Sequence, residues 1–170
     1  MRVIKLGLIS IVIFGILIYL FSLIIPSQVR ISRAINIAVA KDTLAGFISD
    51  LRTWRHWNDM VSAQDSSNGS YEASSYSGKN LRISLISANH DSVITNWQHG
   101  SSEAIRSGFN LVQSLSDTTV AQWYFDFQLK WYPWEKFGSI IFDQQLGPAM
   151  EKSLRNLKNT MENQPADGYR

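Results

Sequence analysis

A run of 20 residues without a charged side chain, residues 6–25, constrains this chain more than any other feature. At about 1.5 Å of rise per residue, a helix of that length spans the roughly 30 Å hydrocarbon core of a bilayer. A cleaved signal peptide is the main alternative, but its apolar stretch usually has about 7–15 residues and ends in small side chains. Here the run ends in Leu23-Ile24-Ile25, directly before Pro26. We therefore predict an N-terminal transmembrane anchor over residues 1–26, with a buried core helix as a more distant alternative.

The basic residues on the two sides of this run are nearly balanced. Arg2 and Lys5 precede it, and Arg30, Arg33 and Lys41 follow it. A short basic head followed directly by an apolar run is the usual layout of a signal anchor. We therefore expect the N-terminus in the cytoplasm and the remaining chain on the non-cytoplasmic side of the membrane.

The rest of the chain, about 145 residues, has the usual length of one domain. We predict a single domain over residues 27–163, followed by a polar tail over residues 164–170 that starts at Gln164-Pro165. The whole chain has 16 Lys and Arg and 14 Asp and Glu, so that without Arg2 and Lys5 the counts are 14 and 14. A neutral domain offers no electrostatic footprint for phosphate backbones, so we expect no nucleic-acid partner.

Cysteine is absent from the sequence. This excludes a disulfide framework, a thiolate nucleophile and a cysteine-based zinc site. The three histidines, His56, His90 and His99, have no spacing that places two of them on one helix face. We therefore expect neither a metal site nor a cofactor.

Strand and helix periodicities alternate along the predicted domain. Residues 29–39 alternate apolar and polar side chains as a half-buried strand does, with Arg33 in the apolar phase, where we expect it to reach out to water or lipid headgroups. Residues 41–51 follow the spacing of a short amphipathic helix, and residues 53–59 form a second short helix or turn that carries Trp54 and Trp57. Residues 62–78 are rich in serine and predict loops around at most one weak strand.

Four further strands are predicted at short spacing, over residues 80–87, 92–99, 104–115 and 118–131. Hairpin-length turns between them indicate an antiparallel sheet. From residue 138 the period becomes helical, with a stripe of Leu146, Met150, Leu154, Leu157 and Met161. Pro148 must either begin this C-terminal helix or kink it. The order of elements predicts an α+β architecture with a long helix packed on a curved sheet.

Residues 29–57, VRISRAINIAVAKDTLAGFISDLRTWRHW, resemble the opening of the SRPBCC (START-like, polyketide cyclase/dehydrase and lipid-transport) superfamily. Residues 143–162, DQQLGPAMEKSLRNLKNTME, look like the C-terminal helix of that family. Bacterial membrane-anchored members begin with a similar apolar segment that ends in proline. After its two tryptophans this chain has Asn58-Asp59-Met60, where the family usually has a Pro-Trp pair.

The resemblance implies a helix-grip (START-like) fold, in which a curved antiparallel sheet wraps around a long C-terminal helix and leaves a central cavity for an apolar or amphipathic molecule. It also implies a single-pass location in the bacterial inner (cell) membrane. The candidate cavity residues are large side chains on the predicted inner faces, with one histidine at the rim: Trp54, Trp57, Trp97, His99, Trp123, Phe125, Phe127, Met150 and Leu154. The alternative is that these side chains fill the core, which periodicity alone does not distinguish.

No sequence motif indicates catalysis, because no pair of carboxylates and no nucleophile motif stands at a usable spacing. The leading hypothesis is a membrane-tethered binding protein that holds a lipid-like small molecule. A cyclase or hydratase that uses His99 inside the same cavity is the second hypothesis. A non-catalytic module that contacts a membrane partner through its sheet edge or helix is the third. The Tyr132-Pro133-Trp134 run is either an aromatic group at the lipid headgroups or a packed corner.

Overall fold

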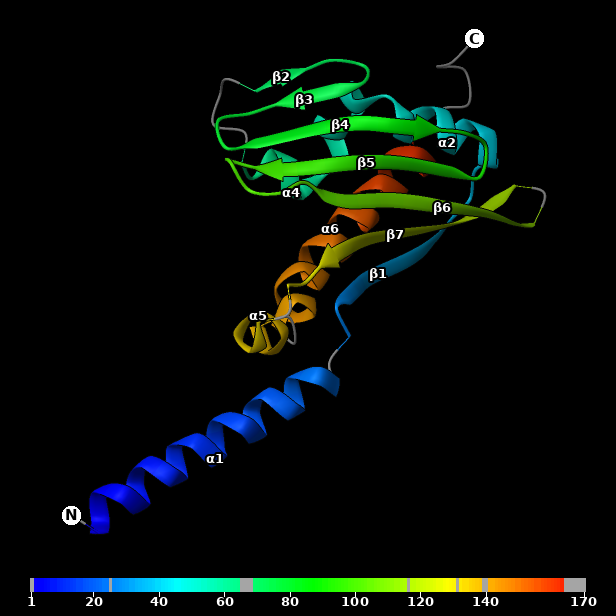
Figure 1. The fold of residues 1–170 in the computed structure, drawn as a ribbon. Coiled ribbons are helices and arrows are strands. Elements are labelled where there is room, and N and C mark those ends of the chain that lie inside the picture. Colours follow the sequence, from blue (N-terminus) through cyan, green and yellow to red (C-terminus); the bar gives the residue numbers. More distant parts are fainter. Residues whose placement is uncertain are drawn as a thin grey trace.

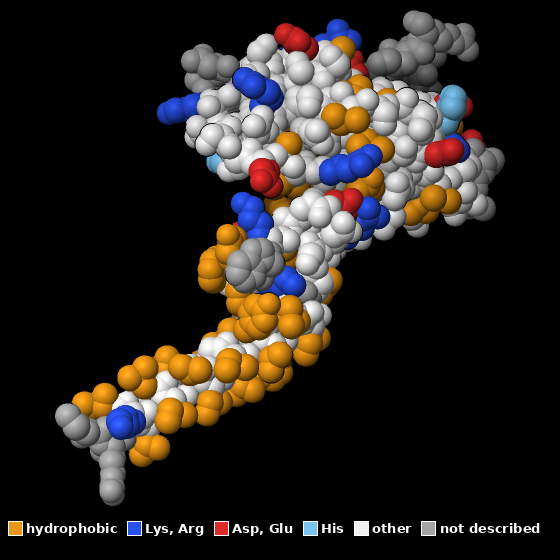
Figure 2. Space-filling view, in the orientation of Figure 1, with side chains coloured by type: hydrophobic (Ala, Val, Ile, Leu, Met, Phe, Trp, Pro, Cys, Tyr) orange, Lys and Arg blue, Asp and Glu red, His pale blue; other side chains and the backbone are white. Residues whose placement is uncertain are grey.

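The computed structural model describes residues 2–24, 26–64, 69–115, 117–130, 132–138 and 141–163. Its first element is a long helix, α1 (Arg2–Ile24), which projects away from the rest of the chain (Figure 1). The part Ile4–Ile24 is long and apolar enough to cross a membrane. Its large apolar side chains are exposed, and Figure 2 shows them along the helix surface. The predicted polar tail, residues 164–170, lies outside the described residues.

Seven strands form one antiparallel sheet in the order β1-β7-β6-β5-β4-β3-β2. The strands are β1 (Gln28–Ile37), β2 (Ser70–Tyr71), β3 (Ser75–Ser77), β4 (Leu81–Ala88), β5 (Ser92–His99), β6 (Ile105–Leu115) and β7 (Thr118–Gln128). The chain therefore lays β1 beside the last strand, and β4 to β7 follow one another as hairpins. Two of these strands, β2 and β3, lie in the serine-rich segment where at most one was predicted.

The helices of this part of the chain lie between β1 and β2 and after β7 in the sequence. They are α2 (Lys41–Ser49), a 3₁₀ turn η1 (Leu51–Thr53), α3 (Trp54–Trp57), α4 (Asp59–Ser62), α5 (Pro133–Gly138) and α6 (Phe142–Asn163). Helix α2 packs against strands β4 to β7, while α6 packs against β1, α3 and α4 (Figure 1). This confirms the predicted α+β architecture with a long C-terminal helix.

Strand β7 shows the predicted alternation most clearly. Ala121, Trp123 and Phe125 are buried on the inner face, as expected of one apolar side of a half-covered sheet. Tyr124 points to the outer face and is nevertheless buried, because it lies over Gly108 and under the Arg30 guanidinium, 4.2 Å from the ring centroid. The strand ends at Gln128, three residues earlier than predicted.

The sequence predicted that Arg33 reaches out to water or lipid headgroups. In the structure its guanidinium instead joins β1 to α6 through ion pairs. Its Nη1 and Nε atoms donate to Asp143 Oδ1 at 2.9 Å and Glu151 Oε1 at 2.8 Å. A Cβ atom at position 147 would clash with the guanidinium, so Gly147 gives it room to cross the helix. The helix neither begins nor stops at Pro148 but continues through it. The sequence could not predict this clamp, because both carboxylates lie more than 100 residues after Arg33 in the chain.

Candidate functional site

Six aromatic side chains meet on the inner face of the sheet and form what we call the aromatic core: Trp54, Trp57, Trp97, Phe109, Trp123 and Phe125. Each is at most 5% exposed. Their ring centroids lie 5–6 Å apart, within the range of favourable aromatic pairs, and Phe109 stacks on Trp123 at 5.2 Å. These side chains contact one another directly, as the residues of a packed interior do.

Three indole N–H groups of the aromatic core donate hydrogen bonds to oxygen atoms of the protein. Trp54 Nε1 donates to the Ile48 carbonyl at 2.8 Å. Trp97 Nε1 donates to Thr95 Oγ1 at 3.1 Å, and Trp123 Nε1 donates to Ser107 Oγ at 2.9 Å. Because buried donors are costly unless they are paired, these bonds fix the orientations of the three rings.

Two neighbouring donors differ from these three. Trp57 Nε1 and Asn58 Nδ2 are buried and have no hydrogen-bond acceptor among the described residues. Exchanging the oxygen and nitrogen of the Asn58 side-chain amide would not solve this, because Oδ1 already accepts a hydrogen bond from the Val61 backbone amide at 3.3 Å, at the start of α4. An acceptor atom placed beside these two N–H groups would stabilise them.

The remaining predicted cavity residues lie around this core. Met150 and Leu154 are buried on the face of α6 that covers it. Phe127 is half-buried and forms ring contacts with Phe125 at 6.4 Å and with Phe142 at 4.9 Å. His99 is exposed at the end of β5, although it shares the phase of Trp97. That these residues contact a ligand stays a prediction.

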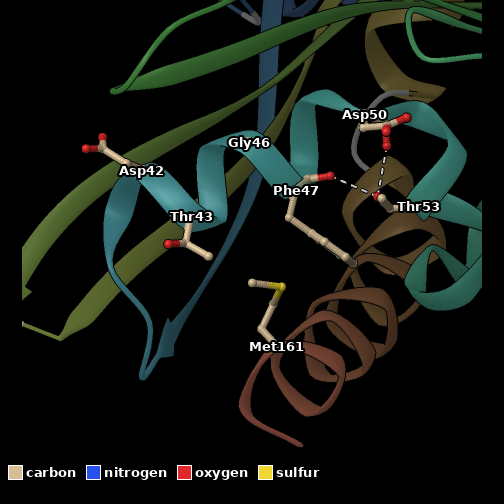
Figure 3. Close-up of a pocket in the computed structure, with 7 residues that line it drawn as sticks. All are labelled: Asp42, Thr43, Gly46, Phe47, Asp50, Thr53 and Met161. Atoms are coloured by element: carbon tan, nitrogen blue, oxygen red, sulfur yellow. Dashed lines mark hydrogen bonds between the residues drawn. The ribbon is translucent and has the colours of Figure 1, made fainter. Parts of the chain in front are cut away.

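An open groove lies between α2, η1 and the end of α6, at the end of the domain away from α1 (Figures 1 and 3). It has a volume of about 520 Å³, within the size range of small-molecule sites. Its lining, which we call the α2–α6 groove, consists of Asp42, Thr43, Gly46, Phe47, Asp50, Thr53 and Met161. In Figure 3, Phe47 and Met161 approach each other across the groove, and both belong to the hydrophobic core.

Gly46 lies beside open space on the α2 side of this groove. A Cβ atom at Gly46 would meet nothing within 4 Å, so the space beside the helix backbone is free. Thr53 is fixed at the other end, where its single hydroxyl proton is shared between the carbonyls of Phe47, 2.9 Å from Oγ1, and Asp50, 2.8 Å from Oγ1. These hydrogen bonds fix the turn between α2 and η1, which forms this end of the groove.

Carboxylates lie at both ends of the groove. The Arg52 guanidinium donates to Asp50 at 2.6 Å from Nη2 and at 2.9 Å from Nε, and these bonds hold the pKa of Asp50 below its usual range. Asp42 lies 2.8 Å from His90 Nδ1. The rim therefore presents oxygen acceptors around an apolar floor.

Sequence reasoning missed this groove. Gly46, Thr43 and Thr53 fall on positions that hydrophobic periodicity reads as solvated, so no pattern marks them. The one available signal was a glycine in the interior of a short helix, a position that costs stability and so can have a packing or functional reason.

Among the described residues, no three His, Asp or Glu side chains gather in a way that could hold a metal ion.

Comparison with known proteins gives results at the level of structure only. A scan against protein-family models and a search of curated proteins both give no match. Among solved structures, a START superfamily protein from Mycobacterium smegmatis is similar with a TM-score of 0.53 and 16% identity, over 78% of this chain and 97% of that one. A protein from Thermobifida fusca is similar with a TM-score of 0.57 and 10% identity, over 78% and 92% of the chains.

Norcoclaurine synthase from Thalictrum flavum, solved with dopamine and hydroxybenzaldehyde, is similar with a TM-score of 0.55 and 12% identity, over 81% of this chain and 89% of that one. This chain has an SRPBCC/START-like fold. The helix-grip arrangement that the resemblance implied is thereby confirmed, with α6 as the gripped helix. The START-like fold is one that accommodates ligand binding or cyclase-type chemistry, and fold alone does not decide between them.

Proposed function

We propose that this chain is a membrane-anchored START-like protein that binds a hydrophobic or amphipathic small molecule in the α2–α6 groove. The observation that carries the proposal is an open space of about 520 Å³ with an apolar floor and a polar rim. Binding sites for small molecules commonly combine these features. A structural neighbour that holds two small aromatic molecules adds support to a small-molecule ligand.

The lining indicates the chemistry of this ligand. Phe47 and Met161 offer an aromatic face and a polarisable thioether, which suit an aliphatic or aromatic body. Asp42, Asp50 and the threonine hydroxyls offer mostly acceptors, which suit hydroxyl or amino groups on the ligand. We therefore propose an amphipathic molecule with a donor-bearing polar end.

The membrane part of the proposal is supported by α1. Its apolar side chains are exposed, which is unfavourable in water and favourable in lipid. We place the helix in the bacterial inner membrane as a single-pass anchor, with the START-like domain on the non-cytoplasmic side. A C-terminal alkaline phosphatase fusion tests the orientation, because that enzyme is active only outside the cytoplasm. An inactive fusion would indicate the opposite orientation, with the domain in the cytoplasm.

Mass spectrometry of residues 27–170 tests the ligand. No described residue of α1 belongs to the hydrophobic core, so this fragment keeps the whole core. We would compare co-purifying molecules by native mass spectrometry and solvent extraction in the unaltered fragment, in Gly46→Phe and in Gly46→Ala. The phenylalanine fills the groove, whereas the alanine leaves most of it open.

The expected result is one amphipathic molecule bound in the unaltered fragment and in Gly46→Ala, and lost from Gly46→Phe while that variant stays folded. A ligand retained by Gly46→Phe would contradict the proposal that the ligand binds in the α2–α6 groove. It would favour a binding site inside the aromatic core, near the Trp57 and Asn58 donors. A fragment that neither retains nor rebinds extracted membrane lipids or aromatic amines would contradict ligand binding altogether.

A further inference from the structure

The end of the START-like domain that adjoins the proposed anchor carries a short helix of its own. Helix α5 packs against α1, and in Figure 1 it lies at the end of the domain that faces α1. Ser22, near the end of α1, is fully buried, unlike the apolar side chains around it. Since α5 packs against α1, any bilayer that contains α1 has its surface close to α5.

Exposed apolar side chains surround α5. Trp134 is 69% exposed, and its ring stacks on that of Tyr132 with centroids 4.8 Å apart and planes 10° apart. Ile141, directly before α6, is 48% exposed. Figure 2 shows apolar side chains continuing from α1 onto this end of the domain. The stacked pair has the amphipathic character of the tryptophan and tyrosine residues that gather at membrane interfaces.

Several charged side chains near α5 are paired or buried within the protein, but the Lys130 side chain is exposed and forms no ion pair among the described residues. Arg30 forms an ion pair with Asp126 at 2.6 Å, and Arg33 pairs with Asp143 at 2.9 Å. Glu135 Oε2 accepts from the backbone amide of Lys130 at 2.9 Å, and Lys136 is buried. An attraction of this surface to lipid therefore depends mainly on apolar and aromatic contact, to which Lys130 adds an attraction to anionic headgroups.

We infer that α5 is an interfacial helix that seats the START-like domain on the lipid surface through Trp134, Tyr132 and Ile141. This inference rests on the proposed membrane anchoring and is independent of the ligand. It makes the domain attach at two places, through α1 in the bilayer and through α5 on its surface. A zwitterionic membrane is sufficient for this contact.

Spin labelling of the full chain tests the inference, because the sequence has no cysteine to compete with an introduced one. We would place a nitroxide at Trp134→Cys, at Ile16→Cys in α1 and at Ile86→Cys in β4, each in phosphatidylcholine nanodiscs. Ile86 is a matched control because it is also an exposed apolar side chain, at 54%. The measurement is the ratio of collisions with oxygen, which enters lipid, to collisions with a water-soluble nickel complex.

We expect the highest ratio at position 16, an intermediate ratio at position 134 and the lowest at position 86, with 134 severalfold above 86. A low ratio at 134 with a high ratio at 16 would overturn the inference while keeping the anchor, and would leave a protein as the partner of this face. Low ratios at both 16 and 134 would overturn the anchor and the inference together.

Discussion

The aromatic core and the α2–α6 groove are two parts of one interior, and they are built from opposite kinds of residue. The core is made of large aromatic side chains in contact with one another, and three of its four tryptophans donate hydrogen bonds. The groove is made of Gly46, two threonines and two carboxylates around a floor of Phe47 and Met161. The comparison teaches that the conspicuous aromatic residues hold the fold together, while the open space arises where side chains are small.

The core should respond most strongly to mutation. We expect Trp123→Ala to lower the free energy of unfolding by about 3–5 kcal/mol, because it removes a fully buried ring and leaves a cavity. Urea denaturation followed by circular dichroism measures this change. A loss below about 1 kcal/mol would break the comparison, since it would show that the core is loosely packed and has room for a ligand.

A matched pair within α3 sharpens the description of the core. Trp54 and Trp57 are both 1% exposed, but only Trp54 Nε1 has a named acceptor among the described residues. We expect Trp54→Phe to cost about 1 kcal/mol more than Trp57→Phe, because it leaves the Ile48 carbonyl without its donor. Equal costs in urea denaturation would show that the Trp57 N–H is paired in the folded protein.

Two glycines should respond to alanine in opposite directions. We expect Gly46→Ala to raise the free energy of unfolding by about 0.5–1 kcal/mol, because it replaces a helix-interior glycine in open space. Gly100→Ala is the control and should lower it by about 1–2 kcal/mol, because Gly100 has a φ of 56°. Thermal melts measure both changes. A destabilised Gly46→Ala would mean that the groove wall is packed against something.

The smallest expected effect concerns the clamp between β1 and α6. The hydrogen bond from Arg33 lowers the pKa of Asp143, so the pair stabilises the fold above the ordinary carboxyl pKa of about 4. This stabilisation is lost as the pH falls through the lower pKa of the folded state. Asp143→Asn should therefore melt slightly below the unaltered protein at neutral pH, and the gap should narrow as the pH falls below the ordinary carboxyl pKa. A gap that does not narrow with falling pH would contradict the assignment.

Much of the fold could be predicted from local patterns. The alternation in β7 indicated that Trp123 and Phe125 face inward, and the helical stripe of α6 indicated that Met150 and Leu154 are buried. The groove could not be predicted, because Gly46 and Thr43 leave no periodic signal and the floor needs Met161 from the far end of the chain. The Arg33 clamp was missed for the same reason, since its partners meet only after folding.

The pairing of β1 has a mechanical consequence. This edge strand follows directly after the proposed anchor, and its ten residues pair with β7 along their whole length, from Gln28↔Gln128 to Ile37↔Thr119. Ladder hydrogen bonds run perpendicular to the strands, so a pull along β1 loads them in shear and all together. Arg33 adds a cross-link to α6 within the same strand. Tension between membrane and domain would therefore be spread over the ladder instead of opening it one bond at a time.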